Sequence, residues 1–330
     1  MSQPIRIATF NVENLDEEKP NIRKPSLEER FKIMQPQLER LNADIIFFQE
    51  IHAQKLSDRA DDFEFTALKK LLKGTRYENF QIAPQLPEEK HLVNRFRNLV
   101  VVSRFEIVET KQYKHDFIEA PVYKKVTAIP AEEAKKITWE RPITYSKIKL
   151  PNQQVLHCLN LHLKSKNPTN IDGQKVNTYT WRTAYGWAEG YFISSMKRVG
   201  QALETRRLID DIMDNNENPL IMVCGDLNAD SDDVPVKAIL GEVENTGNGD
   251  LAHRVMVPCQ KTVPESSRYT LWHHGKREMI DHLLISRNML QYYKGTEIHN
   301  ETLPDESIAF AYDTKFPESD HAPVVAEFVF

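Results

Sequence analysis

The feature that most constrains this sequence is a repeated pattern of short apolar runs, each ending in a small group of polar residues. The runs are rich in β-branched and aromatic residues and therefore predict strands, and the polar groups predict loops at the strand ends. Taken singly, each group is most simply a turn or a helix cap. Together they predict side chains that converge at one edge of a sheet. The six groups are Asn11 with Glu13, Gln49-Glu50, Asn160 with His162, Asp226 with Asn228, Asp281-His282, and Ser319-Asp320-His321.

The same pass along the chain predicts many strands and few helices. Ser26 and Glu29 have the spacing of a capping box, so a helix should begin there, and Pro36 should kink or interrupt it. Further helices are predicted at 62–72 and 194–216, and residues 111–141 form an elaborated connection. The strands are predicted at 5–10, 45–48, 99–103, 142–150, 154–162, 220–224, 279–286 and 322–330. No internal repeat or low-complexity linker is seen, so we expect residues 1–330 to form one α/β domain with two packed sheets and covering helices.

Composition excludes some classes of protein. The net charge of −5 argues against binding polyanions through bulk charge, although a local basic patch or a bound metal can still do so. The three cysteines are far apart, and Cys158 and Cys224 lie in apolar runs, so buried thiols are expected. Neither a signal segment nor a membrane-spanning apolar stretch is recognisable. We expect a cytoplasmic protein with no stable membrane association, and no protein partner is predicted.

Carboxylates gathered at one sheet edge repel each other unless a cation or a proton neutralises them. Oxygen-rich, thiol-free ligands are those that Mg²⁺ prefers, with Mn²⁺ as a substitute. Zinc is disfavoured because the sequence has no His-Glu-x-x-His helix and its histidines are scattered. A Gly-x-x-x-x-Gly-Lys loop is also absent, which argues against kinases and nucleotide-driven motors.

The order of these motifs resembles that of the endonuclease/exonuclease/phosphatase superfamily, which includes DNase I, abasic-site endonucleases, sphingomyelinases and inositol-polyphosphate 5-phosphatases. The motifs are Phe10-Asn11-Val12-Glu13-Asn14-Leu15, Phe48-Gln49-Glu50, Asn160-Leu161-His162, Gly225-Asp226-Leu227-Asn228, Ile280-Asp281-His282 and Ser319-Asp320-His321-Ala322-Pro323. Segments 97–105, 162–166 and 198–202 look closest to bacterial nuclease-like members. The resemblance fades in the loops 52–75, 108–140 and 167–197, where substrate choice usually lies. It implies a four-layer α/β sandwich, with two mostly antiparallel sheets packed face to face and helices outside.

The resemblance also implies roles for individual residues. Glu50 looks like the principal Mg²⁺ ligand, assisted by Asn11, Glu13 and Asp320. Asp226 would orient or deprotonate the attacking water, with Asn228 holding phosphate or water beside it. His321 would contact the scissile phosphate and be oriented by Asp281, whereas His162 matches a second histidine of the DNase I and sphingomyelinase branches. By contrast, His282 is expected to be structural and His273-His274 to lie in a surface turn.

The substrate is predicted from residues 164–207, which hold eight Lys or Arg against three Asp or Glu, interleaved with aromatic residues. Cations and flat rings together suit a nucleic-acid strand. Two alternatives stay open, a helix with a solvated basic face and an aromatic segment that dips into a membrane surface. The leading hypothesis is a Mg²⁺-dependent nuclease acting on DNA first and on RNA second. The alternatives are a phosphatase or lipid phosphodiesterase with the same metal chemistry, and a non-catalytic binding protein.

Overall fold

The structure, a computed structural model, describes residues 4–17, 25–55, 63–84, 94–311 and 316–330 and contains two six-stranded sheets. Sheet I has the order β17 (Tyr293–Ile298), β18 (Val324–Phe328), β1 (Ile5–Leu15), β2 (Ile45–Ile51), β6 (Asn98–Ser103) and β5 (Gln81–Ala83). Sheet II has the order β13 (Met256–Pro258), β16 (Asp281–Ser286), β12 (Leu220–Asp226), β11 (Val155–His162), β10 (Ile143–Lys149) and β7 (Ile107–Tyr113).

Strand pairing explains why the polar groups meet. Most neighbours are antiparallel, but β1 pairs with β2 and β11 pairs with β12 in parallel. In parallel pairs both carboxyl ends lie at the same sheet edge, so Asn11 is level with Gln49 and His162 is level with Asp226. Antiparallel β16 runs the other way and brings its first residue, Asp281, level with Asp226. The predicted convergence of strand ends therefore follows from the register.

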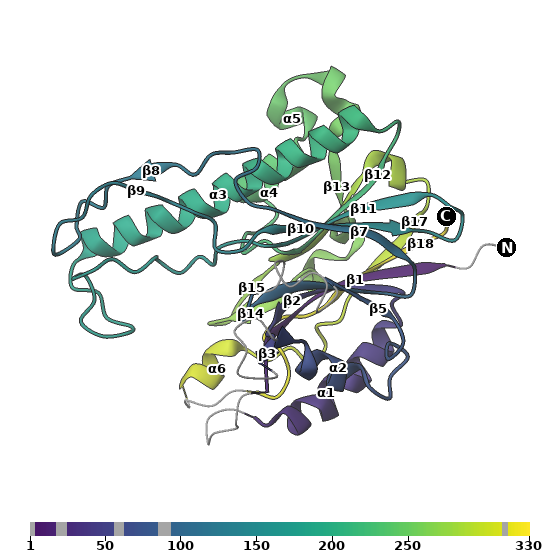
Figure 1. The fold of residues 1–330 in the computed structure, drawn as a ribbon, viewed down its shortest axis with the longest axis horizontal. Helices are drawn as coiled ribbons and strands as arrows, with labels where there is room; N and C mark the ends of the chain where they lie inside the picture. The colour runs from purple at the N-terminus through teal and green to yellow at the C-terminus, as the bar shows by residue number, and fades with distance from the viewer. Residues whose placement is uncertain (1–3, 18–24, 56–62, 85–93, 312–315) are drawn as a thin grey trace.

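The two sheets pack face to face, and helices cover their outer faces, which gives four layers (Figure 1). The inner core joins the sheets through residues such as Phe47 of β2 and Met222 of β12. One outer core packs α1 (Leu27–Leu41) and α2 (Thr66–Leu72) on sheet I. The other packs α3 (Ala184–Asn215) and α4 (Val234–Leu240) on sheet II. The predicted four-layer sandwich is confirmed.

The helices differ from the sequence predictions in three places. The capping box of Ser26 and Glu29 begins α1 as predicted, but the helix runs through Pro36 without interruption. The buried side chains of Met34 and Leu38, on either side of the proline, hold both halves of the helix on the same core. Helix α2 begins only at Thr66, because Phe63–Glu64 form strand β4. This strand pairs with β3 (Gln54–Lys55). Asp62, where the helix was predicted to begin, lies outside the described residues. Helix α3 starts ten residues earlier than the predicted 194–216.

The early start of α3 builds a projection from the body of the molecule. The first half of α3 extends beyond sheet II and packs against β8 (Val122–Tyr123), β9 (Lys135–Lys136) and the segment that follows β11 (Figure 1). The predicted connection 111–141 begins within β7 and includes β8 and β9. We call residues 114–141 and 164–198 the arm. Among the described residues, no helix is long and apolar enough to cross a membrane.

Smaller elements complete the chain and include the walls of the site described below. They are the hairpin of β14 (Leu271–His273) and β15 (Lys276–Glu278), helix α6 (Glu306–Ala311), helix α5 (Val243–Thr246) and 3₁₀ turns at Gly249–Arg254, Cys259–Thr262, Glu265–Ser267 and Arg287–Met289.

Candidate active site

A cavity of about 440 Å³ lies at the edge of both sheets where the polar strand ends meet. Seven of the nine residues predicted for the site line it, namely Glu13, Glu50, His162, Asp226, Asn228, Asp320 and His321. The other two are buried and lie directly behind this lining. Asn11 donates a hydrogen bond to Asp226 and Asp281 bonds to His321. The structure therefore brings all nine predicted residues together.

Asp226, the last residue of β12, is the centre of this group. Its Oδ2 accepts hydrogen bonds from Nδ2 of Asn11 (3.0 Å) and Nδ2 of Asn228 (3.1 Å), and Nε2 of His162 lies 3.2 Å away. Its Oδ1 accepts the backbone N–H of Asn228 at 2.8 Å. The donors come from β1 of sheet I and from the loop after β12 of sheet II, so the carboxylate is held in one orientation by both sheets.

The hydrogen-bond partners of Asp226 depend on a close approach of β11 and β12. Gly225 has a φ of +124°, and a Cβ atom there would lie 2.0 Å from the carbonyl oxygen of Leu161. Only glycine fits between the two strands at this point. The glycine before Asp226 thereby lets His162 and Asp226 stand side by side.

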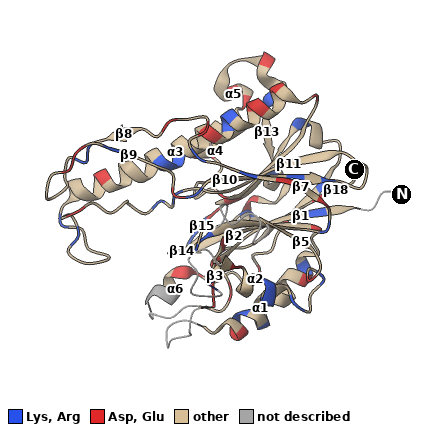
Figure 2. Cartoon of the chain, in the orientation of Figure 1, with Lys and Arg blue, Asp and Glu red and all other residues tan. Residues whose placement is uncertain are grey.

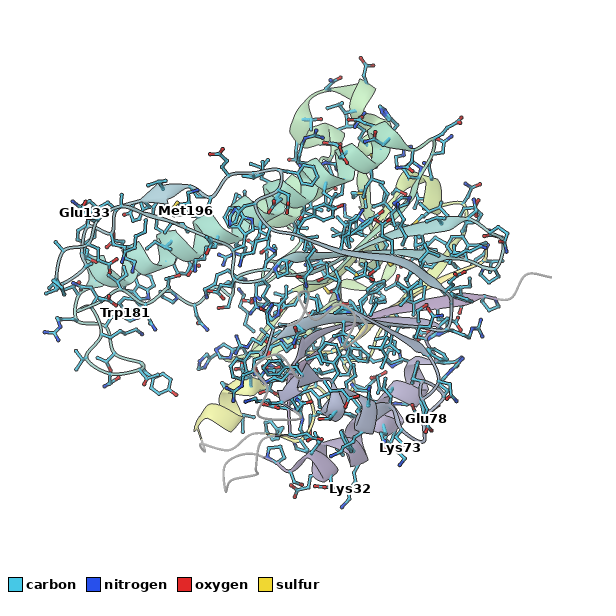
Figure 3. All side chains as sticks on the ribbon, viewed as in Figure 1. Lys32, Lys73, Glu78, Glu133, Trp181 and Met196 are labelled. Carbon is cyan, nitrogen blue, oxygen red and sulfur yellow. The ribbon has the colours of Figure 1, made fainter. Side chains whose placement is uncertain are left out.

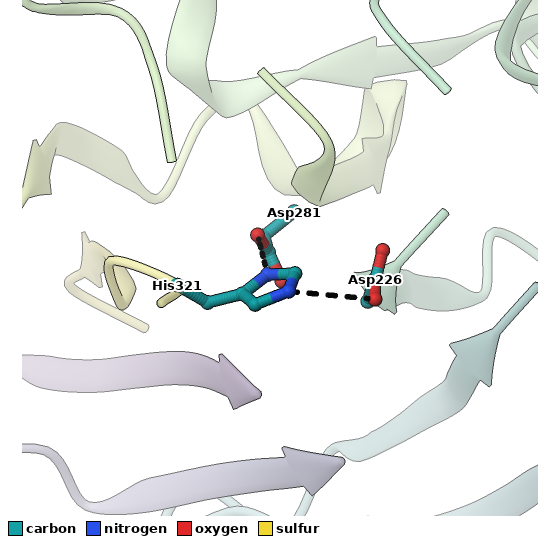
Figure 4. A group of neighbouring side chains, drawn as sticks. All are labelled: Asp226, Asp281 and His321. Carbon is teal, nitrogen blue, oxygen red and sulfur yellow. Dashed lines mark hydrogen bonds and ion pairs between the residues drawn. The ribbon is translucent and has the colours of Figure 1, made fainter. Parts of the chain in front are cut away.

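His321 lies between two carboxylates (Figure 4). Its Nδ1 is 2.8 Å from Oδ2 of Asp281, and its Nε2 faces Oδ2 of Asp226 at 4.0 Å. The ligand atoms of the three side chains all lie within 4.8 Å of one another. Burial lowers the pKa of His321, but the carboxylates of Asp281, Asp320 and Asp226 outweigh burial and hold the pKa well above its ordinary value. The ring is therefore a cation at neutral pH, and its charge offsets those of the neighbouring carboxylates.

His162 is in the opposite protonation state. Burial, followed by the positive charges of Arg141 and His321, holds its pKa well below the ordinary value. The ring is neutral, its Nε2 lies 3.2 Å from Oδ2 of Asp226, and its buried Nδ1 has no hydrogen-bond partner among the described residues. Burial raises the pKa of Asp226 to about 7, a shift that His321 opposes and Asp281 reinforces. A carboxyl with a pKa near 7 is suited to accept a proton at neutral pH.

The acidic residues predicted to hold the metal come from sheet I and its loops. Glu50 is the penultimate residue of β2, with its Oε2 accepting the N–H of Asn14 at 3.0 Å and its Oε1 3.6 Å from Nε2 of His162. Burial, reinforced by Glu13, raises the pKa of Asp320 to about 8, and its buried Oδ1 has no hydrogen-bond partner among the described residues. A buried carboxylate oxygen without a donor, beside other acids, is what a divalent cation would neutralise. The donor set therefore fits a hard cation with oxygen ligands.

Arg30 of α1 joins the loops that carry two of these acids. Its buried guanidinium donates to the carbonyl oxygens of Val12 (2.6 Å), Glu13 (3.0 Å) and Pro317 (3.2 Å). The loop after β1 and the segment before Asp320 are thereby held side by side. Sequence reasoning did not identify Arg30, because its predicted position on an amphipathic helix gives no sign of this contact.

The backbone around the site has left-handed conformations that non-glycine residues rarely adopt. Glu50 has a φ of +63°, and Glu13 and Asn228 each have a φ of +47°. Arg97, which also lines the cavity, has a φ of +56°. Such conformations are unfavourable unless the surrounding contacts impose them, and they gather at functional sites. Their concentration around one cavity supports its assignment as the active site.

Three cations at the cavity were not singled out from the sequence. The Nε of Arg97 is 3.8 Å from Oε2 of Glu50, and Lys166 pairs with Glu278 at 2.8 Å. Arg141 is buried against the cavity, where its Nη1 donates to the carbonyl oxygen of His162 at 3.0 Å. Arg141 stands just before the apolar strand β10, so an arginine entering a buried strand was the available signal. These cations can meet the oxygens of an anionic substrate.

Two further histidines with positions predicted from the sequence, His282 and His273, lie in different surroundings. His282 is fully buried and bonds to Gln260 (2.7 Å) and to the carbonyl oxygen of Ala229 (2.9 Å), as expected of a structural residue. His273, predicted to lie in a surface turn, instead lines the cavity from β14 and is 3.0 Å from Glu306 of α6. The turn itself is present, but the hairpin folds over the site and carries His273 to its rim.

Fold and site together define a hydrolase of phosphate esters, and comparison with known proteins gives its family. The sequence model of the Endonuclease/Exonuclease/phosphatase family matches residues 8–321, so this chain belongs to that family. Its members hydrolyse phosphoester bonds, generally with a divalent metal, and this chain is such an enzyme. The family predicted from the order of motifs is confirmed.

Solved structures share the fold at low sequence identity. Truncated TDP2 of Caenorhabditis elegans is 15% identical, with a TM-score of 0.57 over 99% of this chain and 98% of that one. An endonuclease/exonuclease/phosphatase family protein from Bacteroides thetaiotaomicron is 14% identical, with a TM-score of 0.55 over 100% and 97%. D. rerio TDP2, in complex with a single-strand DNA product, is 14% identical, with a TM-score of 0.54 over 98% of each chain. Among curated proteins no match was found.

Proposed function

We propose that this protein is a Mg²⁺-dependent nuclease that hydrolyses phosphodiester bonds of DNA, and secondarily of RNA, with residues 1–330 acting as one catalytic domain. The observation that carries the proposal is the fixed position of Asp226, whose Oδ2 is faced by neutral His162 and cationic His321, beside the acids of sheet I. The single-strand DNA product in the related D. rerio TDP2 structure supports a nucleic-acid substrate.

Each side chain has a role that its contacts allow. Asp226, with a pKa raised to about 7, accepts the proton of the attacking water, and Asn228 holds the carboxylate and the water in place. His321 donates a proton or hydrogen bond to the phosphate, because Asp281 keeps its ring charged and oriented. His162 adds a neutral hydrogen-bond donor next to Asp226.

Glu50, with Asn11, Glu13 and Asp320, would hold the Mg²⁺ ion. Mn²⁺ could take its place, since both ions prefer oxygen ligands. Such a cation polarises the phosphate and stabilises the negative charge that develops on its oxygens. Asn11 fixes the relative positions of the two halves of the site, since its Nδ2 donates to Asp226 while its Oδ1 accepts the N–H of Glu13 (3.0 Å).

The charge of the cavity favours a phosphodiester over a phosphomonoester. Among the described lining residues, six acids stand against the cationic His321 and three lysine or arginine side chains, Arg97, Arg141 and Lys166. A dianionic monoester requires a compact and strongly basic pocket. A phosphodiester carries one charge per phosphate, and its neighbouring groups can extend out of an open site. This contrast favours the nuclease over the phosphatase alternative.

The test is cleavage of supercoiled plasmid and of labelled single strands with Mg²⁺, with Mn²⁺ or with EDTA. We expect metal-dependent cutting that falls by at least about 10²-fold in Glu50→Ala and in His321→Ala. Two exposed residues provide matched controls, Glu28→Ala and His253→Ala, and both should cut like the wild type.

Nucleic acid that stays intact with every metal would reject the nuclease proposal. The same protein would then be assayed on phosphomonoesters and on sphingomyelin, and hydrolysis lost in Glu50→Ala would assign the site to one of those substrates.

A further inference from the structure

The arm concentrates exposed apolar surface that its own packing does not require. It carries nine of the seventeen large hydrophobic side chains that are exposed among the described residues. Five of the nine are the aromatic residues Tyr179, Tyr185, Trp187, Tyr191 and Phe192, and four are β-branched. Exposed apolar surface gathered on one projection indicates a binding surface.

Two of these rings, those of Trp187 and Tyr191, form an aromatic face on one side of the start of α3. Trp187 and Tyr191 are four residues apart and therefore lie on the same side of the helix, and Ser194 and Arg198 follow on that side at i+7 and i+11. The rings of Trp187 and Tyr191 stack, with centroids 5.7 Å apart and planes at 28°. Trp187 remains 46% exposed and Tyr185 65% exposed. Flat ring faces are therefore offered to the solvent.

The arm is also basic within an acidic chain. It contains twelve lysines and arginines against seven acidic residues, a net charge of +5, whereas the whole chain has −5. Figure 2 shows Lys and Arg along the arm, and Lys124, Lys136 and Arg182 are among the exposed ones. Trp181, labelled in Figure 3, has Nζ of Lys175 4.2 Å from its ring centroid. A local charge of this sign is complementary to a polyanion.

The aromatic face is continuous with the active-site cavity. Ser165 and Asn167 line the cavity, and α3 is hydrogen-bonded to both. Nη1 of Arg198 donates to the carbonyl oxygen of Ser165 (3.0 Å). Oγ of Ser194 donates to the carbonyl oxygen of Asn167 (2.8 Å). Tyr191 is one helical turn from Ser194 and Trp187 is two turns away, about 10 Å along the helix axis. A bound chain could therefore reach from the rings to the catalytic groups.

From these observations we infer that the arm is a binding platform for single-stranded nucleic acid that leads its backbone to the cavity. Bases stack on Trp187 and Tyr191, and lysines and arginines of the arm meet the phosphates. Tyr and Trp suit this role because their polar edges stay hydrated while their faces stack. The inference rests on the proposed nuclease function and adds the strand form and the path of the substrate.

Binding is tested with fluorescein-labelled oligo(dT) of about 20 nucleotides, by anisotropy in EDTA so that the strand is not cut. The double variant Trp187→Ala/Tyr191→Ala should bind at least about tenfold more weakly. The matched control is Leu203→Ala, which removes another half-exposed side chain from α3 outside the arm and should bind like the wild type. Unchanged circular dichroism and Tm would show that the variants fold. For bis(p-nitrophenyl) phosphate the double variant should keep its rate, while its KM for the oligonucleotide rises.

Three results would overturn the inference. The double variant could bind oligo(dT) as well as the wild type does, or the wild type could fail to bind it. Third, co-flotation of the wild type with phosphatidylcholine–phosphatidylserine vesicles that depends on Trp187 and Tyr191 would assign the arm to a membrane. The nuclease proposal fails separately: arm-dependent binding without any cleavage would keep the platform and reject the nuclease.

Discussion

At the scale of single residues, the site works by giving similar groups different protonation states. His321 and His162 both face Oδ2 of Asp226, yet carboxylates hold the pKa of His321 above its ordinary value and burial holds that of His162 below it. Asp281 accounts for much of the difference, since it bonds to one imidazole at 2.8 Å and is not bonded to the other. One ring can then donate as a cation and the other as a neutral hydrogen-bond donor.

A residue outside the site gives a prediction for stability against pH. His157 of β11 is buried, its Nδ1 is 2.8 Å from Oη of Tyr145, and burial, with Lys147, lowers its pKa from 6.5 to about 4. Between these two values the unfolded chain binds a proton that the folded protein does not, so stability rises with pH through this window and is lost as pH falls from 6.5 to 4. We expect the histidine to contribute about 2 kcal/mol of the loss between pH 7 and pH 4.5.

Urea denaturation at these two pH values measures this contribution. His157→Asn, whose Oδ1 can accept from Tyr145, should lose less stability on acidification than the wild type by about that amount. His253→Asn changes an exposed histidine and should keep the wild-type difference. If His157→Asn loses as much stability as the wild type, another group is responsible.

At the scale of elements, the arm is held together by one buried carboxylate. Glu189 of α3 accepts the N–H groups of Val126 (2.5 Å) and Thr127 (2.9 Å) and the hydroxyls of Tyr123 (2.9 Å) and Thr127. Burial raises the pKa of Glu189, and these donors lower it. The donors outweigh burial, so the pKa lies below its ordinary value. The ionised carboxylate thus connects the loop after β8 to the helix.

We predict that Glu189→Ala loosens the arm and leaves the two sheets intact. The substitution removes the acceptor of four hydrogen bonds, and buried donors left without a partner are unfavourable by about 1–3 kcal/mol each. Amides of residues 122–128 should exchange with solvent at least about tenfold faster, while those of β11 and β12 stay protected. Hydrogen exchange with mass spectrometry measures both regions.

Glu133→Ala is the control, since it removes an exposed glutamate from the same loop. Equal exchange of residues 122–128 in wild type and Glu189→Ala would show that Glu189 does not hold the arm.

At the scale of the whole molecule, the sequence predicts features that depend on a local pattern of residues. It misses contacts that form only when distant segments of the chain pack together. Strand ends with polar groups are visible in the chain, so Glu50, Asp226 and His321 could be found as candidates. Arg30 could not, because it acts through carbonyl groups that tertiary packing alone places near it, and the one signal for Arg141 was an arginine just before a buried strand. Pro36 was predicted to kink or interrupt α1, but the helix continues through it, because burial of the surrounding helix on sheet I overrides the local preference.

The assembly also divides the chemistry between the sheets. The four residues proposed to hold the metal belong to sheet I and its loops, whereas Asp226, Asn228 and His162 belong to sheet II and its loops. The bond from Asn11 to Asp226 and that between His321 and Asp281 join the two groups. Neither half has a complete site, so only the packed sandwich can bind the metal beside the water-activating carboxylate.

Metal ligands that only the folded chain brings together should stabilise the native state when the ion binds. Mg²⁺ at about one hundred times its Kd would add about 2.7 kcal/mol, which for a chain of this length raises Tm by about 4 °C. Glu50→Gln should abolish this rise in Tm. Its Tm without metal need not fall, because the substitution relieves repulsion between Glu50 and Asp320. Glu28→Gln, an exposed change on α1, should keep the full rise. Calorimetry with increasing Mg²⁺ decides the matter: an equal rise in Glu50→Gln would place the ion elsewhere, and no rise in the wild type would remove the metal from the proposed site.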